Sequence, residues 1–73
     1  GQSPEFQTLE PLTEREKKIL ILLANAVSNE EMAQRLFVSK NTIKFHLKNI
    51  YAKLAVSSRY QAINAARAMG LVR

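Results

Sequence analysis

Two helical patterns in this sequence are separated by only three residues, Phe37 to Ser39, and this spacing constrains the fold more than any other feature. Before the joint, apolar residues recur at helical spacing over about two turns. After it, a second apolar stripe repeats at intervals of four, three and four residues, formed by Ile43, Leu47, Ile50 and Leu54. Helices joined by so short a link cross steeply instead of lying antiparallel. This is the geometry of a helix-turn-helix.

Serine and threonine residues that can cap helices mark the starts of four predicted helices. The segments "TERE" from Thr13, "SNEE" from Ser28 and "SRYQ" from Ser58 have the form of capping boxes, and Ser39 can cap the helix after the joint. Gly70 suits the residue that follows the last helix. The sequence therefore predicts a compact all-α domain with helices at about 14–26, 29–36, 40–54 and 59–69. The buried positions predicted for the first and last helices are Ile19, Leu22, Leu23, Ala26, Ala62, Ile63, Ala66 and Met69.

The length of 73 residues is that of one domain at most. The start, "GQSPEF", resembles a cloning remnant, so we assign residues 1–11 to a remnant and linker and residues 12–73 to the domain. The sequence has no cysteine, which excludes a disulfide framework or a thiolate metal site. The longest apolar stretch, Ile19 to Val27, is too short to span a bilayer, and no signal-peptide pattern is present. We therefore expect a cytoplasmic protein.

The charges are segregated along the chain. Residues 1–31 contain six acids and three cations, for a net charge of −3, whereas residues 32–73 contain eight cations and no acid. Such segregation favours a polyanionic partner, either nucleic acid or an anionic membrane surface. The alternative is an accidental sign bias on a solvated surface. The basic half offers little apolar area for membrane binding and no aromatic platform for stacking single-stranded RNA.

Residues that could carry catalysis are scarce. The only histidine is His46, which lies beside the buried stripe of the third helix, where it can pack against the core or contact a phosphate. Packing is the favoured role. Glu30 and Glu31 are adjacent and therefore diverge on a helix. We find no pairing of nucleophile and base, no metal-binding cluster and no glycine-rich phosphate loop, so we predict that the chain is not an enzyme and uses no cofactor.

The third helix, residues 39–54, has an outward face suited to DNA. Lys40, Lys44 and Lys48 recur every four residues without the glutamates that usually accompany lysines on a solvated helix face. Asn41 and Phe45 share this face. Lysine can bond guanine O6 and N7, and an apolar ring can contact a thymine methyl in the major groove. The alternatives are a plain solvated lysine face and a Phe45 that contacts another protein or the N-terminal segment.

Phosphate contacts are predicted around this helix. The N-terminus of the second helix, at Ser28 and Asn29, can offer backbone N–H groups to a phosphate. Lys53 and Arg59 flank the end of the third helix and supply further cations. Arg59 could equally have a structural role.

Several motifs together resemble the LuxR-type helix-turn-helix domain, also called the GerE or NarL type. The matching pieces are "LTERE", "SNEEMAQRLFVS", "NTIKFHLKNIYAKL" and the pair Ser58–Arg59, and the resemblance extends from about Leu12 to Leu71. The segment "HLKNIYAKL" is most similar to the MalT-like branch, which comprises large ATP-dependent bacterial activators with this domain at the C-terminus.

The resemblance implies a function and a set of contact residues. The domain would be the C-terminal output domain of a bacterial transcription regulator that binds double-stranded DNA sequence-specifically, with residues 39–54 in the major groove. Base contacts would be Lys44, Phe45 and Lys48. The phosphate or mixed contacts, combined with those predicted above, would be Ser28, Asn29, Lys40, Asn41, Thr42, Lys53 and Arg59. The fourth helix would form a homodimer contact on DNA. The alternative is a protein-interaction module that docks on RNA polymerase or on a regulatory domain outside this sequence.

Three positions depart from the family pattern. Ala26 and Ala55 stand where the family usually has glycine. If these sites need positive φ, each alanine costs on the order of 1 kcal/mol; otherwise the joints are rearranged. Ile21 is usually polar in the family and lies off the buried stripe. We expect Ile21 to be partly exposed and to contact either the regulatory domain or the segment Thr8–Pro11.

Overall fold

A computed structural model describes residues 11–72 of the chain. These residues form four helices and no strand: α2 (Glu14–Ala24), α3 (Asn29–Leu36), α4 (Lys40–Leu54) and α5 (Arg59–Ala68). The predicted all-α fold with a helix-turn-helix at α3 and α4 is confirmed. The bounds of α3 and α4 agree with the prediction, whereas α2 ends two residues earlier than predicted and α5 ends one residue earlier. Residues 1–10, which make up most of the proposed linker, lie outside the described residues.

All four predicted N-cap side chains accept a hydrogen bond from the backbone N–H three residues later. The caps are Thr13, Ser28, Ser39 and Ser58, with distances of 3.1 to 3.2 Å. Only the first is a complete capping box, since Glu16 Oε1 also accepts from the Thr13 N–H at 2.9 Å. Local hydrogen bonding therefore sets where each helix begins.

The reciprocal half of the other two predicted boxes is absent from the described residues because each side chain has another partner. The carboxylate of Glu31 accepts from Arg35 Nε at 3.1 Å, one turn further along α3. Gln61 Oε1 accepts from the Ser57 N–H at 2.8 Å, one residue before the cap at Ser58. In each helix a nearby partner thus takes the place of the N-cap N–H as donor to this side chain, and the helix still begins at the predicted residue.

The joints between helices keep left-handed backbone at positions that are not glycine. Ala26 has a φ of 65° and Ala55 a φ of 58°, so the chain retains the glycine-type conformation at both sites instead of rearranging the joints. Phe37, which ends α3, also has a φ of 58°. A residue with a Cβ in this region costs on the order of 1 kcal/mol relative to glycine.

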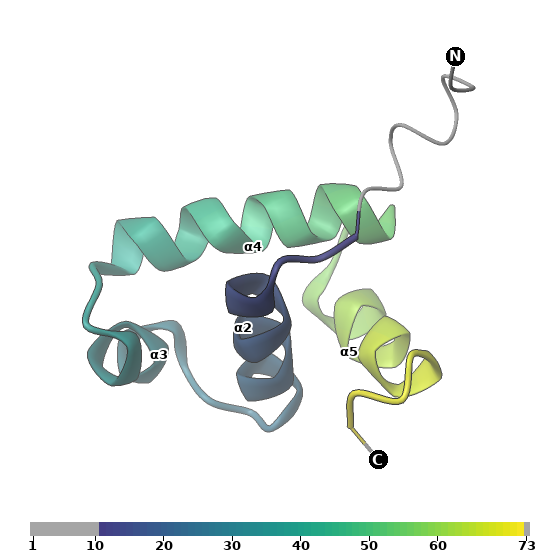
Figure 1. Cartoon of the computed structure of the whole chain (residues 1–73), viewed down its shortest axis with the longest axis horizontal. Coiled ribbons are helices and arrows are strands. Elements are labelled where there is room, and N and C mark those ends of the chain that lie inside the picture. The colour runs from purple at the N-terminus through teal and green to yellow at the C-terminus, as the bar shows by residue number, and fades with distance from the viewer. Residues whose placement is uncertain (1–10, 73) are drawn as a thin grey trace.

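The core lies beneath α4, between it and α2, with α3 on one side and α5 on the other (Figure 1). The buried apolar residues are Leu12, Ile19, Leu20, Leu23, Val27, Met32, Ala33, Ile43, Leu47, Ile50, Ala62 and Ala66. Several residues predicted to be buried are not fully buried, and among them Leu22, Leu54 and Ile63 are half-buried. Leu20 is fully buried while Leu22 is half-buried, because α2 packs against three helices and its buried face is wider than one stripe. Ala26 and Met69 are exposed because both lie beyond the ends of their helices.

Candidate nucleic-acid interface

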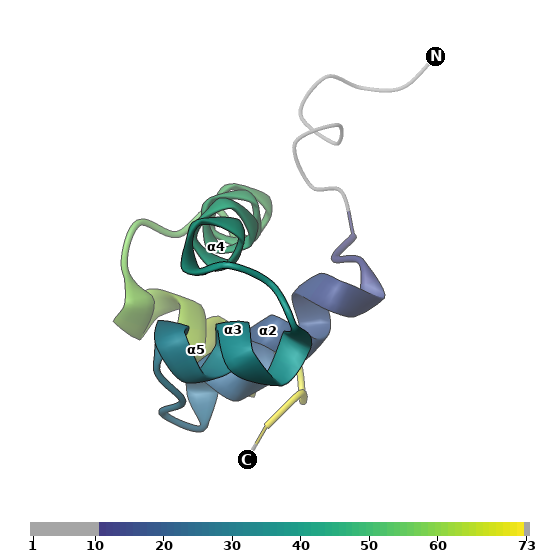
Figure 2. The same cartoon turned by 90° about the vertical axis from the view of Figure 1, so that its left-hand side faces the viewer.

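The outward face of α4 is open along its length. Figures 1 and 2 show α4 at one edge of the molecule, with α2, α3 and α5 all on the same side of it. Ile43, Leu47 and Ile50 point into the core. The opposite face of the helix carries exposed side chains, which are Lys40, Asn41, Lys44, Phe45 and Lys48. Phe45 is 61% exposed. The side chains that the sequence placed on one outward face therefore lie together on it.

The lysines of this face are not engaged by acids of the domain. The ion pairs within residues 11–72 join Glu14 to Lys17, Glu31 to Arg35 and Glu16 to Lys53, and none involves Lys40, Lys44 or Lys48. No acidic residue lies in α4 itself. The face thus presents one ammonium group on each of three successive turns of one helix. A surface of this kind attracts a polyanion and is not stabilised by its own charge pairs.

An aromatic pair lies on the same face. The rings of Phe45 and His46 are 5.8 Å apart between centroids and inclined at 63°, an edge-to-face contact. His46 is half-buried. The imidazole therefore contacts the outward phenyl ring, and the expected packing of His46 against the core stays a prediction.

The first turn of α4 is held by Ser39 and Thr42. Ser39 Oγ accepts from the Thr42 N–H at 3.1 Å, and the two hydroxyl oxygens are 3.0 Å apart. Thr42 is half-buried, while Lys40 and Asn41 are exposed. The first N–H groups of a helix have no partner within the helix, so those of Lys40 and Asn41 are suited to an anion.

The N-terminus of α3 contributes the two polar residues that the sequence suggested. Ser28 Oγ accepts from the Glu31 N–H at 3.1 Å, which occupies this hydroxyl as a cap. Asn29 is half-buried, and its Oδ1 is buried without a hydrogen-bond partner among residues 11–72. Both residues stand at the start of a helix with Glu30 and Glu31 in its first turn.

Lys53 lies in a different setting from the other lysines of α4. Its Nζ donates to Glu16 Oε1 at 2.7 Å and to the Pro11 carbonyl oxygen at 3.4 Å. The side chain of Lys53 is 19% exposed and that of Glu16 is 6% exposed. The ammonium group is thus committed inside the domain, in contrast to the open cation that the sequence suggested for a phosphate.

The ion pair with Lys53 also helps to lower the pKa of the Glu16 carboxyl. Burial raises the pKa of the Glu16 carboxyl, but hydrogen bonds from Lys53 and from the Thr13 N–H, together with the Lys53 charge, outweigh it. The net pKa is below the ordinary value of 4.5.

The sequence contains a signal for the contact between Lys53 and Glu16. Lys53 follows Ile50 by three residues and Glu16 precedes Ile19 by three, so each flanks a buried stripe.

Arg59 also has an intramolecular contact. Its Nη2 donates to the Val27 carbonyl oxygen at 3.4 Å, which links the start of α5 to the joint between α2 and α3. The residue as a whole remains exposed. A single long hydrogen bond uses one of the five N–H donors of a guanidinium, so the structural role and an outward contact are compatible.

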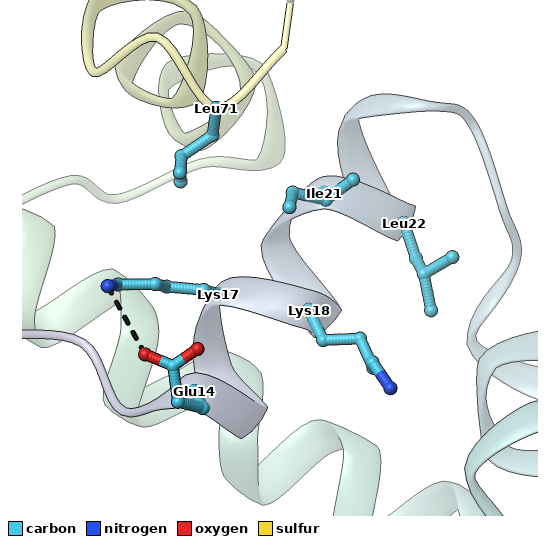
Figure 3. Close-up of a pocket in the computed structure, with 6 residues that line it drawn as sticks. All are labelled: Glu14, Lys17, Lys18, Ile21, Leu22 and Leu71. Carbon is cyan, nitrogen blue, oxygen red and sulfur yellow. Dashed lines mark hydrogen bonds and ion pairs between the residues drawn. The ribbon is translucent and has the colours of Figure 1, made fainter.

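A second surface feature lies on α2, away from α4. A groove of about 400 Å³ is lined by Glu14, Lys17, Lys18, Ile21, Leu22 and Leu71. Figure 3 shows Leu71 from the C-terminal segment facing Ile21 and Lys17 across it. Ile21 is half-buried, which agrees with the prediction of partial exposure. Leu71 was not anticipated, because nothing local signals that the segment after α5 returns to α2.

Other classes of site were also sought among residues 11–72. No group of three or more His, Cys, Asp or Glu side chains in this part of the chain could hold a metal ion. No helix there is both long and apolar enough to cross a membrane.

The chain is similar to known bacterial regulators. Residues 10–66 match the family described as bacterial regulatory proteins, luxR family. The probable transcriptional regulatory protein SgaR of Hyphomicrobium methylovorum is 51% identical over 55 residues, which are 75% of this chain and 26% of SgaR. The transcriptional regulator MalT of Vibrio campbellii is 45% identical over 60 residues, 82% of this chain and 7% of MalT. The relatives therefore include MalT and a probable regulatory protein of another name, SgaR.

A solved structure supports the same assignment. The structure of the transcription factor GerE has a TM-score of 0.77 and 35% identity, and the match covers 85% of this chain and 92% of GerE. The chain spans about a quarter of SgaR and less than a tenth of MalT, so those relatives contain much more than this domain. With its four helices and its helix-turn-helix at α3 and α4, the chain belongs to the LuxR family of bacterial regulatory proteins, a family of transcription regulators.

Proposed function

We propose that this domain binds double-stranded DNA sequence-specifically, with α4 in the major groove, as the output domain of a bacterial transcription regulator. The observation that carries the proposal is the outward face of α4, where Lys40, Lys44 and Lys48 are exposed and unpaired by any acid among residues 11–72. An α-helix with its side chains is about 10–12 Å across, and the major groove is about 12 Å wide. The face therefore fits the groove in both width and charge.

The side chains of this face divide into two roles. Lys44 and Lys48 lie about one turn apart on the exposed face and would bond guanine O6 and N7, with the Phe45 ring beside them against a thymine methyl. The second set contacts phosphates at the rim of the groove. Its members are Ser28, Asn29, Lys40, Asn41, Thr42 and Arg59. We leave Lys53 out of this set because its ammonium group is bound to Glu16.

The first test is an amide NMR titration of this chain with a random-sequence duplex at two KCl concentrations. We expect shift changes over Ser39–Tyr51 and at the start of α3. These changes should shrink sharply at the higher salt, because counterion release drives non-specific binding. Amides of α2 facing the groove at Ile21 serve as the internal control. Silent α4 amides at low salt would contradict the proposal.

The second test separates base contacts from phosphate contacts. A duplex selected from a random pool for tight binding is compared with the unselected pool. We expect Lys44→Ala and Lys48→Ala to weaken binding to the selected duplex by about 1–3 kcal/mol each, and to weaken pool binding much less. Lys18→Ala on α2 is the matched control, because it removes an exposed lysine from another helix. Equal losses on both DNAs would argue that α4 does not contact base edges.

We propose that two domains pair on DNA through α5. Its exposed face carries Tyr60, which is 72% exposed, and Met69 stands at its end. Two copies joined through this face would bind inverted half-sites one or two helical turns apart. The exposed apolar area is small, so we expect the free domain to be a weakly dimerising monomer. Sedimentation of the free domain as a tight dimer would contradict this expectation.

A second function, docking on a regulatory domain, is favoured by the groove on α2. Its floor is apolar, with Ile21, Leu22 and Leu71, and two lysines lie at its edge. It is formed by residues away from the outward face of α4, so both surfaces can be occupied at once. The relatives SgaR and MalT contain the matching region within a much longer chain, which is compatible with docking of this domain on another part of the same protein.

A further inference from the structure

Phe37 combines full exposure with an unfavourable backbone. Its side chain is 94% exposed, the highest value among the four exposed large hydrophobic residues of the described chain. Its φ of 58° and ψ of 44° are left-handed, a conformation that is uncommon for a bulky residue. The turn holds it firmly, since the Phe37 N–H donates to Gln34 at 3.4 Å and the Val38 N–H donates to Ala33 at 3.0 Å. The ring is thus displayed from a rigid position.

The exposed ring of Phe37 does not stabilise the fold. An almost fully exposed side chain buries no apolar area and so adds no hydrophobic stabilisation. At the same place glycine or asparagine would adopt the left-handed conformation more readily. The left-handed backbone itself is shared with Ala26 and Ala55 at the other helix joints, so the feature particular to Phe37 is its exposed ring. A contact with a partner outside residues 11–72 would give the aromatic side chain a role.

The position of Phe37 indicates what the ring contacts. It stands between α3 and α4, two residues before Ser39, the N-cap of α4. In a docked helix-turn-helix the first helix crosses the DNA backbone, and the N-terminal residues of the second contact base edges. The turn that joins them then passes over the rim of the groove. Lys40, an exposed cation with no acidic partner among residues 11–72, follows it, as expected beside a phosphate, whereas Arg35 before it is paired with Glu31.

The geometry points to Phe37 as a further DNA-contact residue, whose ring packs on the sugars of the backbone at the groove rim. This inference rests on the proposed function, because it assumes that α4 enters the groove. The contact is apolar and releases no counterion. It therefore has a different signature from the lysine contacts, since loss of the ring lowers affinity without changing the dependence on salt.

The test is a fluorescence anisotropy titration of a labelled random-sequence duplex at several KCl concentrations. We expect Phe37→Ala to raise Kd about fivefold at every salt concentration, consistent with burial of roughly half a phenyl side chain. The slope of log K against log salt should stay at the native value. Lys40→Ala, which removes a lysine of the proposed phosphate set, is the comparison, and its slope should fall in magnitude by about 0.9. Ile21→Ala is the matched control, an apolar side chain on α2 away from the outward face of α4, and it should leave both quantities unchanged.

A direct readout is ¹⁹F NMR after incorporation of fluorophenylalanine. The chain has three phenylalanines, and the Phe37→Leu variant identifies the resonance of position 37. We expect this resonance to shift on addition of the duplex.

The outcomes distinguish the inferred Phe37 contact from the proposed DNA binding by α4. Native affinity for Phe37→Ala, with a silent ¹⁹F resonance and weakened binding by Lys40→Ala, would overturn the inference while supporting DNA binding by α4. In that case the ring serves a protein partner. Native affinity for both variants would count against the proposed function itself.

Discussion

Removing the charge of Lys53 should destabilise the domain more than removing any other lysine of α4. The substitution Lys53→Met keeps an apolar stem of similar length but leaves the carboxylate of Glu16 without its partner. Glu16 is 6% exposed, so water cannot fully replace the ammonium group. The same substitution at Lys48, which is exposed and unpaired within residues 11–72, removes a cation without creating an orphaned charge.

The expected size of the effect follows from the geometry. At 2.7 Å and an effective dielectric constant of about 20, the charge attraction is roughly 6 kcal/mol before desolvation is subtracted. Breaking a fully buried pair costs about 3–5 kcal/mol. Lys53 retains 19% exposure, so partial solvation reduces this value, and we expect about 2–3 kcal/mol. A domain of this size has a free energy of unfolding of roughly 3–9 kcal/mol, so the loss is a large fraction of the total.

The assay is urea denaturation followed by circular dichroism, with a double-mutant cycle. Glu16→Gln retains the oxygen that accepts from the Thr13 N–H, so the helix cap survives. We expect the double variant Glu16→Gln with Lys53→Met to be more stable than the sum of the single losses implies, because it contains no orphaned charge. Lys48→Met should stay within about 0.5 kcal/mol of the native chain. Equal stability of Lys53→Met and Lys48→Met would refute the reasoning.

Three further predictions follow from other features. Because folding lowers the pKa of Glu16, its carboxylate adds to the free energy of unfolding above pH 4.5, and this contribution is lost as the pH falls through the lower pKa of the folded state. In urea titrations, the stability advantage of the native chain over Glu16→Gln should therefore shrink below pH 4.5. Ala26→Gly should raise the free energy of unfolding by about 0.5–1 kcal/mol, whereas Ala52→Gly in the regular part of α4 should lower it by about 1 kcal/mol. Ile21→Glu should cost less than about 1 kcal/mol in the same assay, and a severe loss would show that Ile21 is a core residue.

Much of the fold was accessible from sequence because the signals are local. The side chains of Thr13, Ser28, Ser39 and Ser58 bond groups only three residues away, so their cap roles do not depend on the rest of the chain. The three-residue joint leaves α3 and α4 little choice of crossing angle. The outward face of α4 follows from helical periodicity once the apolar stripe is identified.

Other features depended on contacts between distant segments. The choice of Leu20 over Leu22 as a fully buried residue arises because α3, α4 and α5 all pack on α2, which no window of the sequence reveals. The groove at Ile21 requires Leu71, fifty residues later, to return to α2. The display of Phe37 depends on a turn geometry that Val38 helps to fix from the neighbouring position.

The lysines of α4 show most clearly which features follow from the sequence alone and which depend on the tertiary structure. Periodicity is enough to place Lys40, Lys44 and Lys48 opposite the core, because 100° per residue is a property of the helix alone. Lys53 lies on the same helix and has the same charge, yet its ammonium group is bonded to a carboxylate 37 residues earlier in the chain. Which cations remain open to a polyanion is thus a matter of packing, because a long side chain at the flank of a buried stripe takes whatever partner the neighbouring helix presents.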